Sequence, residues 1–285
     1  MQFLSFIRNQ TPGFGALAGD GIVDLSARLD IRDLGQALRQ HGADALRELA
    51  QRHGPDFPLS GADGIAAYRP VVADPGKIFC VGLNYHAHRV EAGRAETGNP
   101  TIFLRLADSQ TGHEQPLVIP RESTQVDYEG EIAIVIGQGG RRIAAEHAFR
   151  HILGFACYND GSVRDWQAHT TQWAPGKNFP DTGAFGPTLV EARDIGEDQV
   201  LTLQTRLNGE VMQHADTSML IFPIPELIAY VSTFTALQPG DVIVTGTPGG
   251  VGFKRQPPRF LQHGDRVEVE VSGLGTLANT VRREA

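Results

Sequence analysis

The sequence has few cysteines and no long apolar segment. Its two cysteines, Cys80 and Cys157, both lie in apolar runs and lack the spacing of a zinc site. We expect two buried thiols in a reducing compartment rather than a disulfide. No stretch approaches the roughly 20 apolar residues of a membrane span, and the N-terminus lacks the pattern of a secretory leader. These absences predict a soluble protein of the cytoplasm.

Clusters of basic residues are absent as well. The net charge is -8 over 285 residues, whereas general nucleic-acid binding needs grouped lysines and arginines against the phosphates. A small molecule is therefore the expected partner. The chain also lacks internal repeats, and its 33 glycines and 17 prolines indicate many turns rather than a helical bundle.

The chain is expected to divide into a small and a large part. Residues 1–70 predict a small N-terminal module, in which two short strands are followed by helical patterns. These helical patterns span 31–42 and 44–54. Pro70 and Pro75 mark a linker, so the main domain is expected over residues 75–285.

Strand signals dominate the large part. Residues 130–137 form an apolar run, Asn208-Gly209 is a two-residue hairpin signal, and valines alternate with acidic residues over 266–271. Helical patterns are fewer and span 144–152 and 224–237. Strand and helix do not alternate regularly, so the expected class is β-rich α+β rather than a doubly wound sheet.

Two acids stand where the apolar strand begins. Because strand side chains alternate faces, Glu129 and Glu131 point the same way with Cα atoms roughly 6.6 Å apart. Two bare carboxylates about 4 Å apart repel by about 4 kcal/mol at an effective dielectric of about 20, so a buried pair needs a proton or a cation. Asp160, which ends another apolar run, completes an all-oxygen set that suits Mg²⁺ or Mn²⁺ better than zinc. The alternative is that both glutamates face solvent on an edge strand.

Two histidines follow a strand-like segment. If the chain turns helical after Asn84, His88 and Glu91 lie three residues apart on one face, where the carboxylate would orient the imidazole as a general base. A second interpretation is an HxH metal site formed by His86 and His88 on a strand. A third is that both histidines are ordinary surface residues.

A later polar segment holds further candidates. Asp160, Arg164 and Gln167 follow one another at helical steps of four and three, which would place them on one face. Asp160 could instead cap the helix that follows. Lys177 lies in a loop rich in glycine and proline that could hold an ammonium in place, although an exposed lysine is the ordinary case. Residues 245–252, TGTPGGVG, suit close approach of an anion to the backbone but lack the features of a P-loop.

Together these segments resemble the fumarylacetoacetate hydrolase family, in its branch of acylpyruvate hydrolases and 2-hydroxyhepta-2,4-diene-1,7-dioate isomerases. The likeness runs from Lys77 to Val281 and rests on motifs in a fixed order. These motifs are KIFCVGLNYHAHRVEAG, DYEGEIAIVIG, NDGSVRDWQ, GKNF, LQPGDVIVTGTPGGVG and HGDRVEVEVSGLGTLANTV. The resemblance implies a mixed β-sandwich roll around a Mg²⁺ or Mn²⁺ ion, in a homodimer.

The resemblance also assigns roles to single residues. It implies metal ligands at Glu129, Glu131 and Asp160 and a catalytic dyad at His88 and Glu91. The residues implied to hold the substrate carboxylate or to stabilise the enolate are Arg164, Gln167, Lys177 and Thr247.

The implied reaction is hydrolysis of a carbon-carbon bond in a 2,4-dioxo acid of the acylpyruvate type, with release of pyruvate or a related 2-oxo acid. The metal would chelate the enolate, and His88, oriented by Glu91, would activate water. Decarboxylation, isomerisation and hydration of related acids in aromatic or sugar-acid catabolism use the same parts, and a non-catalytic metal-binding module is the alternative from another class. Ala87 and Pro180 depart from the family pattern beside the pocket, which bears on the substrate rather than on the metal. Candidates for the distal part of the pocket are Arg105, His113 and Gln172.

Overall fold

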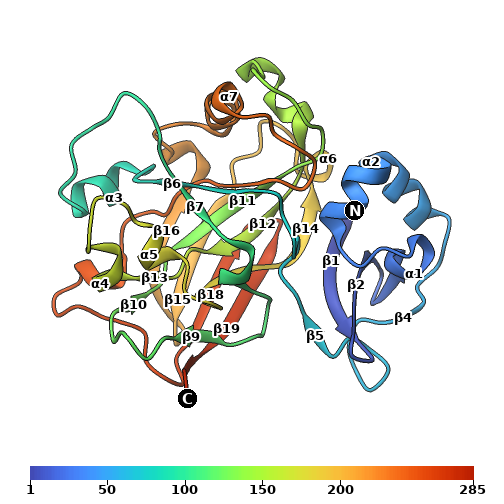
Figure 1. Ribbon diagram of the computed structural model, residues 1–285, viewed down its shortest axis with the longest axis horizontal. Coiled ribbons are helices and arrows are strands. Elements are labelled where there is room, and N and C mark those ends of the chain that lie inside the picture. Colours follow the sequence, from blue (N-terminus) through green and yellow to red (C-terminus); the bar gives the residue numbers. More distant parts are fainter.

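The computed structural model describes residues 1–285 and shows a small N-terminal lobe beside a larger one (Figure 1). The N-terminal lobe contains β1 (Gln2–Arg8), β2 (Thr11–Ala18), β3 (Gly21–Asp24), α1 (Leu25–Leu29), α2 (Leu34–Gln51), β4 (Phe57–Pro58) and β5 (Ala67–Tyr68). The predicted second strand is a hairpin of two, β2 and β3. The two predicted helical patterns form one helix, α2, which is interrupted at Gly42, where φ is 77°.

The largest sheet has 12 strands and runs through both lobes. Its main order is β4-β3-β2-β1-β14-β12-β11-β17-β6-β7, with β5 on β1 and β8 on β14. The strands from the larger lobe are β6 (Ile78–Gly82), β7 (Thr101–Arg105), β8 (Gln110–Thr111), β11 (Gly130–Ile136), β12 (Ile152–Asn159), β14 (Gly183–Glu191) and β17 (Val242–Val244). The central position of β11 decides where the candidate site lies.

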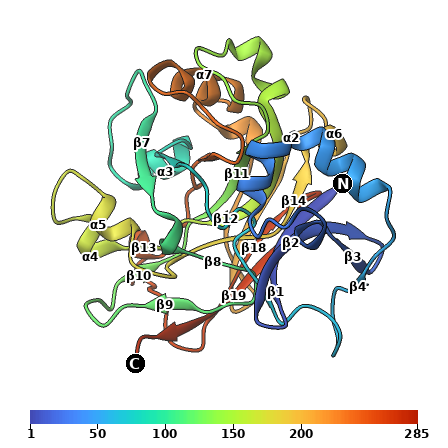
Figure 2. The same ribbon diagram turned by 45° about the vertical axis from the view of Figure 1, so that its right-hand side comes forward.

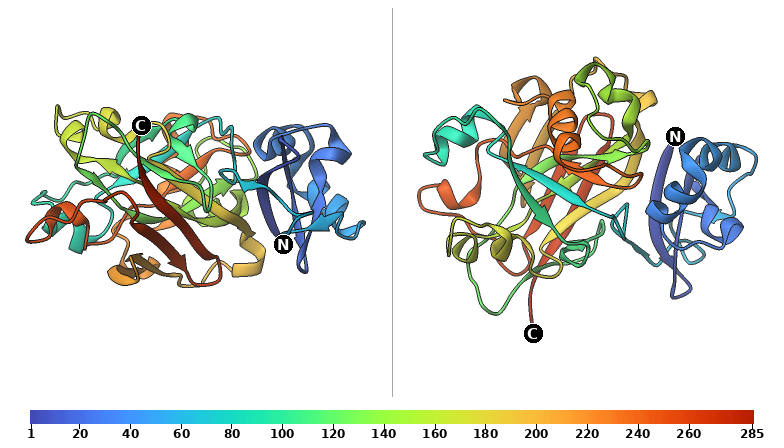
Figure 3. Two further views of the ribbon diagram at one scale, coloured as in Figure 1. Left: turned by 90° about the horizontal axis from the view of Figure 1, so that it is seen from below. Right: turned by 45° about the horizontal axis from the view of Figure 1, so that its top comes forward.

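The two lobes share this sheet through one strand pair. β1 pairs antiparallel with β14, and one apolar cluster contains side chains from both lobes, such as Phe14 and Val135. Figure 3 shows the blue N-terminal lobe at one end of the molecule, and in Figure 2 this lobe comes forward on the right-hand side. A module boundary between residues 70 and 75 therefore stays a proposal.

A second sheet of five strands has the order β16-β15-β18-β19-β9. Its strands are β9 (Leu117–Ile119), β15 (Thr202–Leu207), β16 (Glu210–Asp216), β18 (Arg266–Val271) and β19 (Gly275–Arg283). β15 and β16 form the predicted hairpin, since Asn208 and Gly209 have φ values of 53° and 85°. The valines of β18 are buried, as their alternation predicts. A short third pair joins β10 (Val126–Asp127) to β13 (Ser162–Val163).

Side chains between the two large sheets form the main core. Ile132, Ile134 and Ile136 on one face of β11 join a cluster of 34 buried residues that also includes Val267 and Val269 of β18. The opposite face of β11 is buried too, because Ala133 and Val135 belong to the cluster shared with the N-terminal lobe. β11 is therefore covered on both faces, and the β-rich α+β class is confirmed.

Helices are short in the larger lobe. They are α3 (His86–Glu91), α4 (Arg164–Gln167), α5 (Ala174–Lys177), α6 (Ala192–Ile195) and α7 (Ile224–Phe234), with 3₁₀ segments η1 (Ala107–Ser109), η2 (Ala145–His151), η3 (Thr217–Met219) and η4 (Gly252–Lys254). The predicted helix at 144–152 is the 3₁₀ segment η2 rather than an α-helix, and the one at 224–237 ends at Phe234. None of the helices has both the length and the apolar composition for a membrane crossing. Cys80 and Cys157 are buried and free, as expected.

Because β11 is buried on both faces, a substitution that leaves a cavity at its centre should lower the free energy of unfolding strongly. Ile134 is 0% exposed, so Ile134→Ala should lower the free energy of unfolding by about 2–5 kcal/mol. Val200→Ala is the control, since Val200 is 46% exposed and its loss should change stability by no more than about 0.5 kcal/mol. Urea denaturation of both variants measures the difference, and equal midpoints would contradict this core.

Candidate metal centre and active site

Glu129 and Glu131 lie at the start of β11, in the centre of the large sheet. β11 pairs with β12 on one side and with β17 on the other, and the two glutamates are 4% and 2% exposed. They share one face, because Ile132 and Ile134 enter the core on the other. The interpretation of two solvent-facing acids on an edge strand is therefore wrong.

Asp160 comes from the loop after β12 and reaches the same point. Its backbone N–H donates to the carbonyl oxygen of Glu129 over 2.8 Å, which holds the two chain segments together. One candidate ligand oxygen from each of Glu129, Glu131 and Asp160 lies within 4.8 Å of the others, and all three residues are buried. This spacing allows one divalent ion to contact all three carboxylates.

Asp160 does not belong to the helix that follows it. β13 intervenes, and the N-cap of α4 is Val163, without a side-chain cap. The interpretations of Asp160 as a helix cap, or as a member of one helical face with Arg164 and Gln167, are both wrong because the chain stays extended up to α4. Arg164 and Gln167 do lie on α4, where Arg164 Nη1 donates to Gln167 Oε1 over 3.0 Å.

Buried cations lie against the three acids. Lys177 Nζ is 2.5 Å from Glu129 Oε2 and 2.5 Å from Asp160 Oδ2. Arg164 Nη2 is 2.7 Å from Glu129 Oε1. Lys177 ends the short helix α5 rather than lying in a loop, and it is only 1% exposed, so it is not an ordinary surface lysine. Its ammonium lies between two candidate ligands and shows that this position favours a cation.

The acids differ in how well their charge is neutralised. Burial alone would raise the pKa of Glu129, but the charges of Arg164 and Lys177 outweigh it and hold that pKa well below its usual range. Burial, together with the charges of Asp160 and Glu129, raises the pKa of Glu131 well above its usual value. A backbone N–H, that of Gly246, lies 2.6 Å from Glu131 Oε2. Glu131 is thus the acid whose charge a divalent ion would balance.

Two further buried residues complete the polar network. Arg105 Nη1 donates to Asp160 Oδ1 over 2.5 Å, so Arg105 lies behind that acid and not in the distal pocket as predicted. Asp127 Oδ2 accepts from Arg164 Nε and Nη2 over 2.9 and 2.8 Å. These partners are 55 and 37 positions apart in the chain, so no local pattern could reveal either pair.

His88 and Glu91 face each other on α3, with Nδ1 and Oε2 3.4 Å apart. The Gly250 N–H lies 3.2 Å from each carboxylate oxygen of Glu91 and holds this acid in place. The helix excludes the strand-borne HxH site, and the side chain of His86 is 69% exposed. Because Nδ1 faces Glu91, Nε2 is the ring nitrogen left to meet a substrate.

The glycine-rich loop after β17 orients protein carboxylates with its backbone. Gly246 donates to Glu131 and Gly250 donates to Glu91. Both glycines have positive φ, 107° and 103°, and a Cβ on Gly250 would lie 2.1 Å from the Met212 carbonyl oxygen. The loop therefore approaches anions closely, as its sequence suggests, but these anions are the side chains of the site itself.

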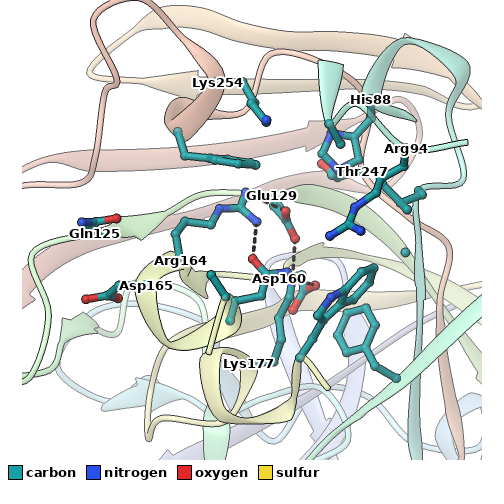
Figure 4. A pocket seen from close by; sticks show the side chains of 18 of the residues that line it. His88, Arg94, Gln125, Glu129, Asp160, Arg164, Asp165, Lys177, Thr247 and Lys254 are labelled. Atoms are coloured by element: carbon teal, nitrogen blue, oxygen red, sulfur yellow. Dashed lines mark hydrogen bonds and ion pairs between the residues drawn. The ribbon is translucent and has the colours of Figure 1, made fainter. Parts of the chain in front are cut away.

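The predicted groups line one cavity of about 650 Å³. Those that line it are His88, Glu129, Glu131, Asp160, Arg164, Gln167, Lys177 and Thr247. Figure 4 shows Glu129, Asp160, Arg164 and Lys177 directed toward one another at its base. Glu91 lies outside the lining, next to His88. The predictions of His113 and Gln172 in this pocket are wrong, because His113 packs on Tyr68 and Gln172 faces solvent.

Thr247 is held by the strand that carries the acids. Its Oγ1 donates to the Gly130 carbonyl oxygen over 2.9 Å and accepts from Gln213 Nε2 over 2.8 Å. Gln213 Oε1 in turn accepts from the Gly130 N–H over 2.9 Å. Gln213 was not predicted from sequence, because it lies 83 positions from Gly130. Gln213 therefore fixes the glycine-rich loop that contains Thr247 against β11.

The fold and this cavity define a class of β-rich α+β proteins with an acidic, metal-sized cluster at the base of a pocket. Residues 77–282 match the sequence family described as Fumarylacetoacetate (FAA) hydrolase C-terminal. The chain belongs to this family, so the resemblance drawn from its motifs is confirmed, together with the family's fold.

Individual relatives narrow the comparison. "Oxaloacetate tautomerase Fahd2a, mitochondrial" of Rattus norvegicus is 38% identical over 266 residues, which cover 92% of this chain and 84% of the relative. "Oxaloacetate tautomerase YisK" of Bacillus subtilis (strain 168) is 39% identical over 220 residues, covering 76% and 73%. A solved putative HpcE protein from Mycobacterium smegmatis has a TM-score of 0.88 and 34% identity, with both chains covered completely. Maleylpyruvate hydrolase from Sphingobium sp. SYK-6, solved with manganese (II) ion and pyruvate, has a TM-score of 0.80 and 27% identity at the same coverage.

The raised pKa of Glu131 has a measurable consequence. A carboxyl whose pKa is raised on folding makes the folded state less stable as pH rises above the unfolded value of about 4.3. Glu131→Gln removes this penalty and can still accept from the Gly246 N–H, so it should raise the free energy of unfolding of the metal-free protein at pH 7. The gain should vanish below about pH 4. Urea denaturation in chelator between pH 4 and pH 8 measures it.

The same variant should lose the response to metal. Mn²⁺ at about 100 times its Kd should stabilise the wild type by about 2.7 kcal/mol and Glu131→Gln by much less. Glu122→Gln is the control, because Glu122 is exposed and lies outside the cavity. A wild type that neither Mn²⁺ nor Mg²⁺ stabilises would argue against a metal centre here.

Proposed function

We propose that the protein is a divalent-metal-dependent enzyme that binds a 2-oxo acid at Glu129, Glu131 and Asp160 and interconverts its keto and enol forms. The observation that carries the proposal is a single cavity that joins three buried carboxylates, with oxygens within 4.8 Å, to an imidazole oriented by Glu91. The relatives named oxaloacetate tautomerases make oxaloacetate the first substrate to test.

The donor set fits Mg²⁺ or Mn²⁺. Glu129, Glu131 and Asp160 offer only carboxylate oxygens, which these ions prefer, and the Lys177 ammonium already lies between two of them. When bound, such an ion would act as a Lewis acid on the carboxylate and the 2-oxo group of the substrate. The manganese in the solved maleylpyruvate hydrolase supports an ion of this kind.

His88 is placed to move the proton. Tautomerisation transfers one proton between C3 and the oxygen on C2, and no bond between heavy atoms breaks. Nε2 of His88 would take the proton from C3 and return it to the oxygen on C2, while Glu91 stabilises the imidazolium formed in between. Lys177 and Arg164 line the same cavity, and their N–H groups would donate hydrogen bonds toward the oxygen on which negative charge develops.

Hydrolysis of a 2,4-dioxo acid, the reaction expected from sequence, is the second candidate. An imidazole hydrogen-bonded to a carboxylate, such as His88 with Glu91, can remove a proton from water as well as from a C–H bond. The maleylpyruvate hydrolase, which shares the fold at 27% identity, also supports hydrolysis. Tautomerisation ranks first because the relatives named for it share 38% and 39% identity. Decarboxylation, isomerisation and hydration use the same site and are distinguished by their products.

We also propose a homodimer located in the cytoplasm. Both follow from the family resemblance and the composition, whereas the name of the rat relative places that protein in mitochondria. Light scattering on the purified protein measures the oligomeric state.

A UV assay on chelator-treated enzyme, with and without Mg²⁺ or Mn²⁺, tests the proposed function. We expect metal-dependent acceleration of the keto-enol relaxation of oxaloacetate without loss of total oxaloacetate. Pyruvate plus a second acid from a 2,4-dioxo acid would indicate hydrolysis, and CO₂ would indicate decarboxylation. No reaction with oxaloacetate or with a 2,4-dioxo acid, despite metal binding, would favour a non-catalytic metal-binding module. Full turnover without metal would overturn the proposal.

Replacement of the proposed base separates catalysis from metal binding. His88→Ala should lower turnover about 100- to 10,000-fold, the usual contribution of general acid-base catalysis. Its stabilisation by Mn²⁺ should match that of the wild type, because His88 is not among the three clustered carboxylates. His86→Ala, two positions away with an exposed side chain, should keep turnover within about twofold. Loss of turnover in both variants would point to damage to α3 rather than to a lost base.

A further inference from the structure

The outer part of the active-site cavity carries two cations that the proposed mechanism does not use. Arg94, from the segment after α3, and Lys254, from η4, both line the cavity. Figure 4 shows the Lys254 ammonium entering the pocket from above Glu129 and the Arg94 guanidinium entering from the side, next to Glu129. Two positive groups therefore converge on the space that a bound substrate would fill.

These cations differ from those at the base of the cavity. Arg164 and Lys177 are neutralised by Asp127, Glu129 and Asp160. Neither Arg94 nor Lys254 has a carboxylate within 4.0 Å, so their charge is free to meet an anionic ligand. The other acid in the lining, Asp165, is occupied by a hydrogen bond of 2.7 Å from Ser123 Oγ.

A ring contact ties Lys254 to the site. Its Nζ lies 5.0 Å from the centroid of Phe253, and the same ring lies 4.1 Å from the guanidinium carbon of Arg164. Cation-π contacts of this kind favour one placement of a flexible side chain. Lys254, whose side chain is exposed, therefore shares the Phe253 ring with Arg164 at the edge of the site.

We propose that Arg94 and Lys254 form a subsite for a second carboxylate, so that the enzyme prefers 2-oxo dicarboxylic acids to 2-oxo monocarboxylic acids. This inference rests on the proposed function, which places the 2-oxo acid end of the substrate at Glu129, Glu131 and Asp160. The rest of the substrate must then extend toward the cavity mouth, where the two free cations converge. Both side chains are exposed, so a carboxylate there would form two solvent-screened ion pairs that complement its charge.

Two acids of equal chain length test the subsite. Oxaloacetate and 2-oxobutyrate differ in a terminal carboxylate or methyl group, and titration calorimetry on the Mn²⁺-loaded enzyme gives a Kd for each. The wild type should bind oxaloacetate more tightly. Arg94→Gln and Lys254→Gln should each weaken oxaloacetate binding about 3- to 10-fold, between the effects of exposed and of buried charge pairs. The double variant should lose most of the preference, with 2-oxobutyrate binding unchanged within about twofold.

Matched controls make the outcomes distinct. Arg141→Gln removes an exposed arginine outside the cavity and should leave both Kd values unchanged. Equal wild-type affinity for the two acids, or variants that weaken both acids equally, would overturn the subsite and leave the proposed function standing. If neither acid bound the Mn²⁺-loaded wild type, the proposed function would fall and the subsite with it.

Discussion

The mutual repulsion of three buried carboxylates governs the structure around the site. Glu129, Glu131 and Asp160 lie on and beside central strands from which water is excluded, where like charges interact strongly. Lys177 and Arg164 neutralise Glu129, and Arg105 neutralises Asp160 from behind. Glu131 is left with a raised pKa and a backbone N–H. A divalent ion bound at the cluster would remove this imbalance.

The fold tolerates the repulsion between these carboxylates because the strand that carries the glutamates is hydrogen-bonded at both edges and packed on both faces. β11 pairs with β12 and β17, and its apolar residues fill the cores on both faces. The glycine-rich loop after β17 adds N–H donors to Glu131 and Glu91, which joins the three clustered carboxylates to the proposed proton-transfer dyad. One loop thus orients both halves of the active site.

Many parts of the site follow from local sequence. Alternation places Glu129 and Glu131 on one face, and the spacing of three in a helix brings His88 against Glu91. Asn208-Gly209 specifies its hairpin because both residues accept positive φ. Family motifs supply the remaining lining residues. Relatives of this chain are named for different reactions, such as oxaloacetate tautomerisation and maleylpyruvate hydrolysis, so the motifs specify the family more closely than they specify the substrate.

The sequence by itself determined the fold class and the family, and it predicted the three clustered acids and the His88-Glu91 pair, because these depend on periodicity and on short ordered motifs. Only the tertiary structure decided that Arg105 lies behind Asp160, that Asp127 holds Arg164, and that Arg94 and Lys254 line the same cavity. It also placed Asp160 outside the helix, at the end of a buried strand. These contacts join residues that are distant in the chain, and their partners are chosen by sheet register and loop packing, which no local pattern records.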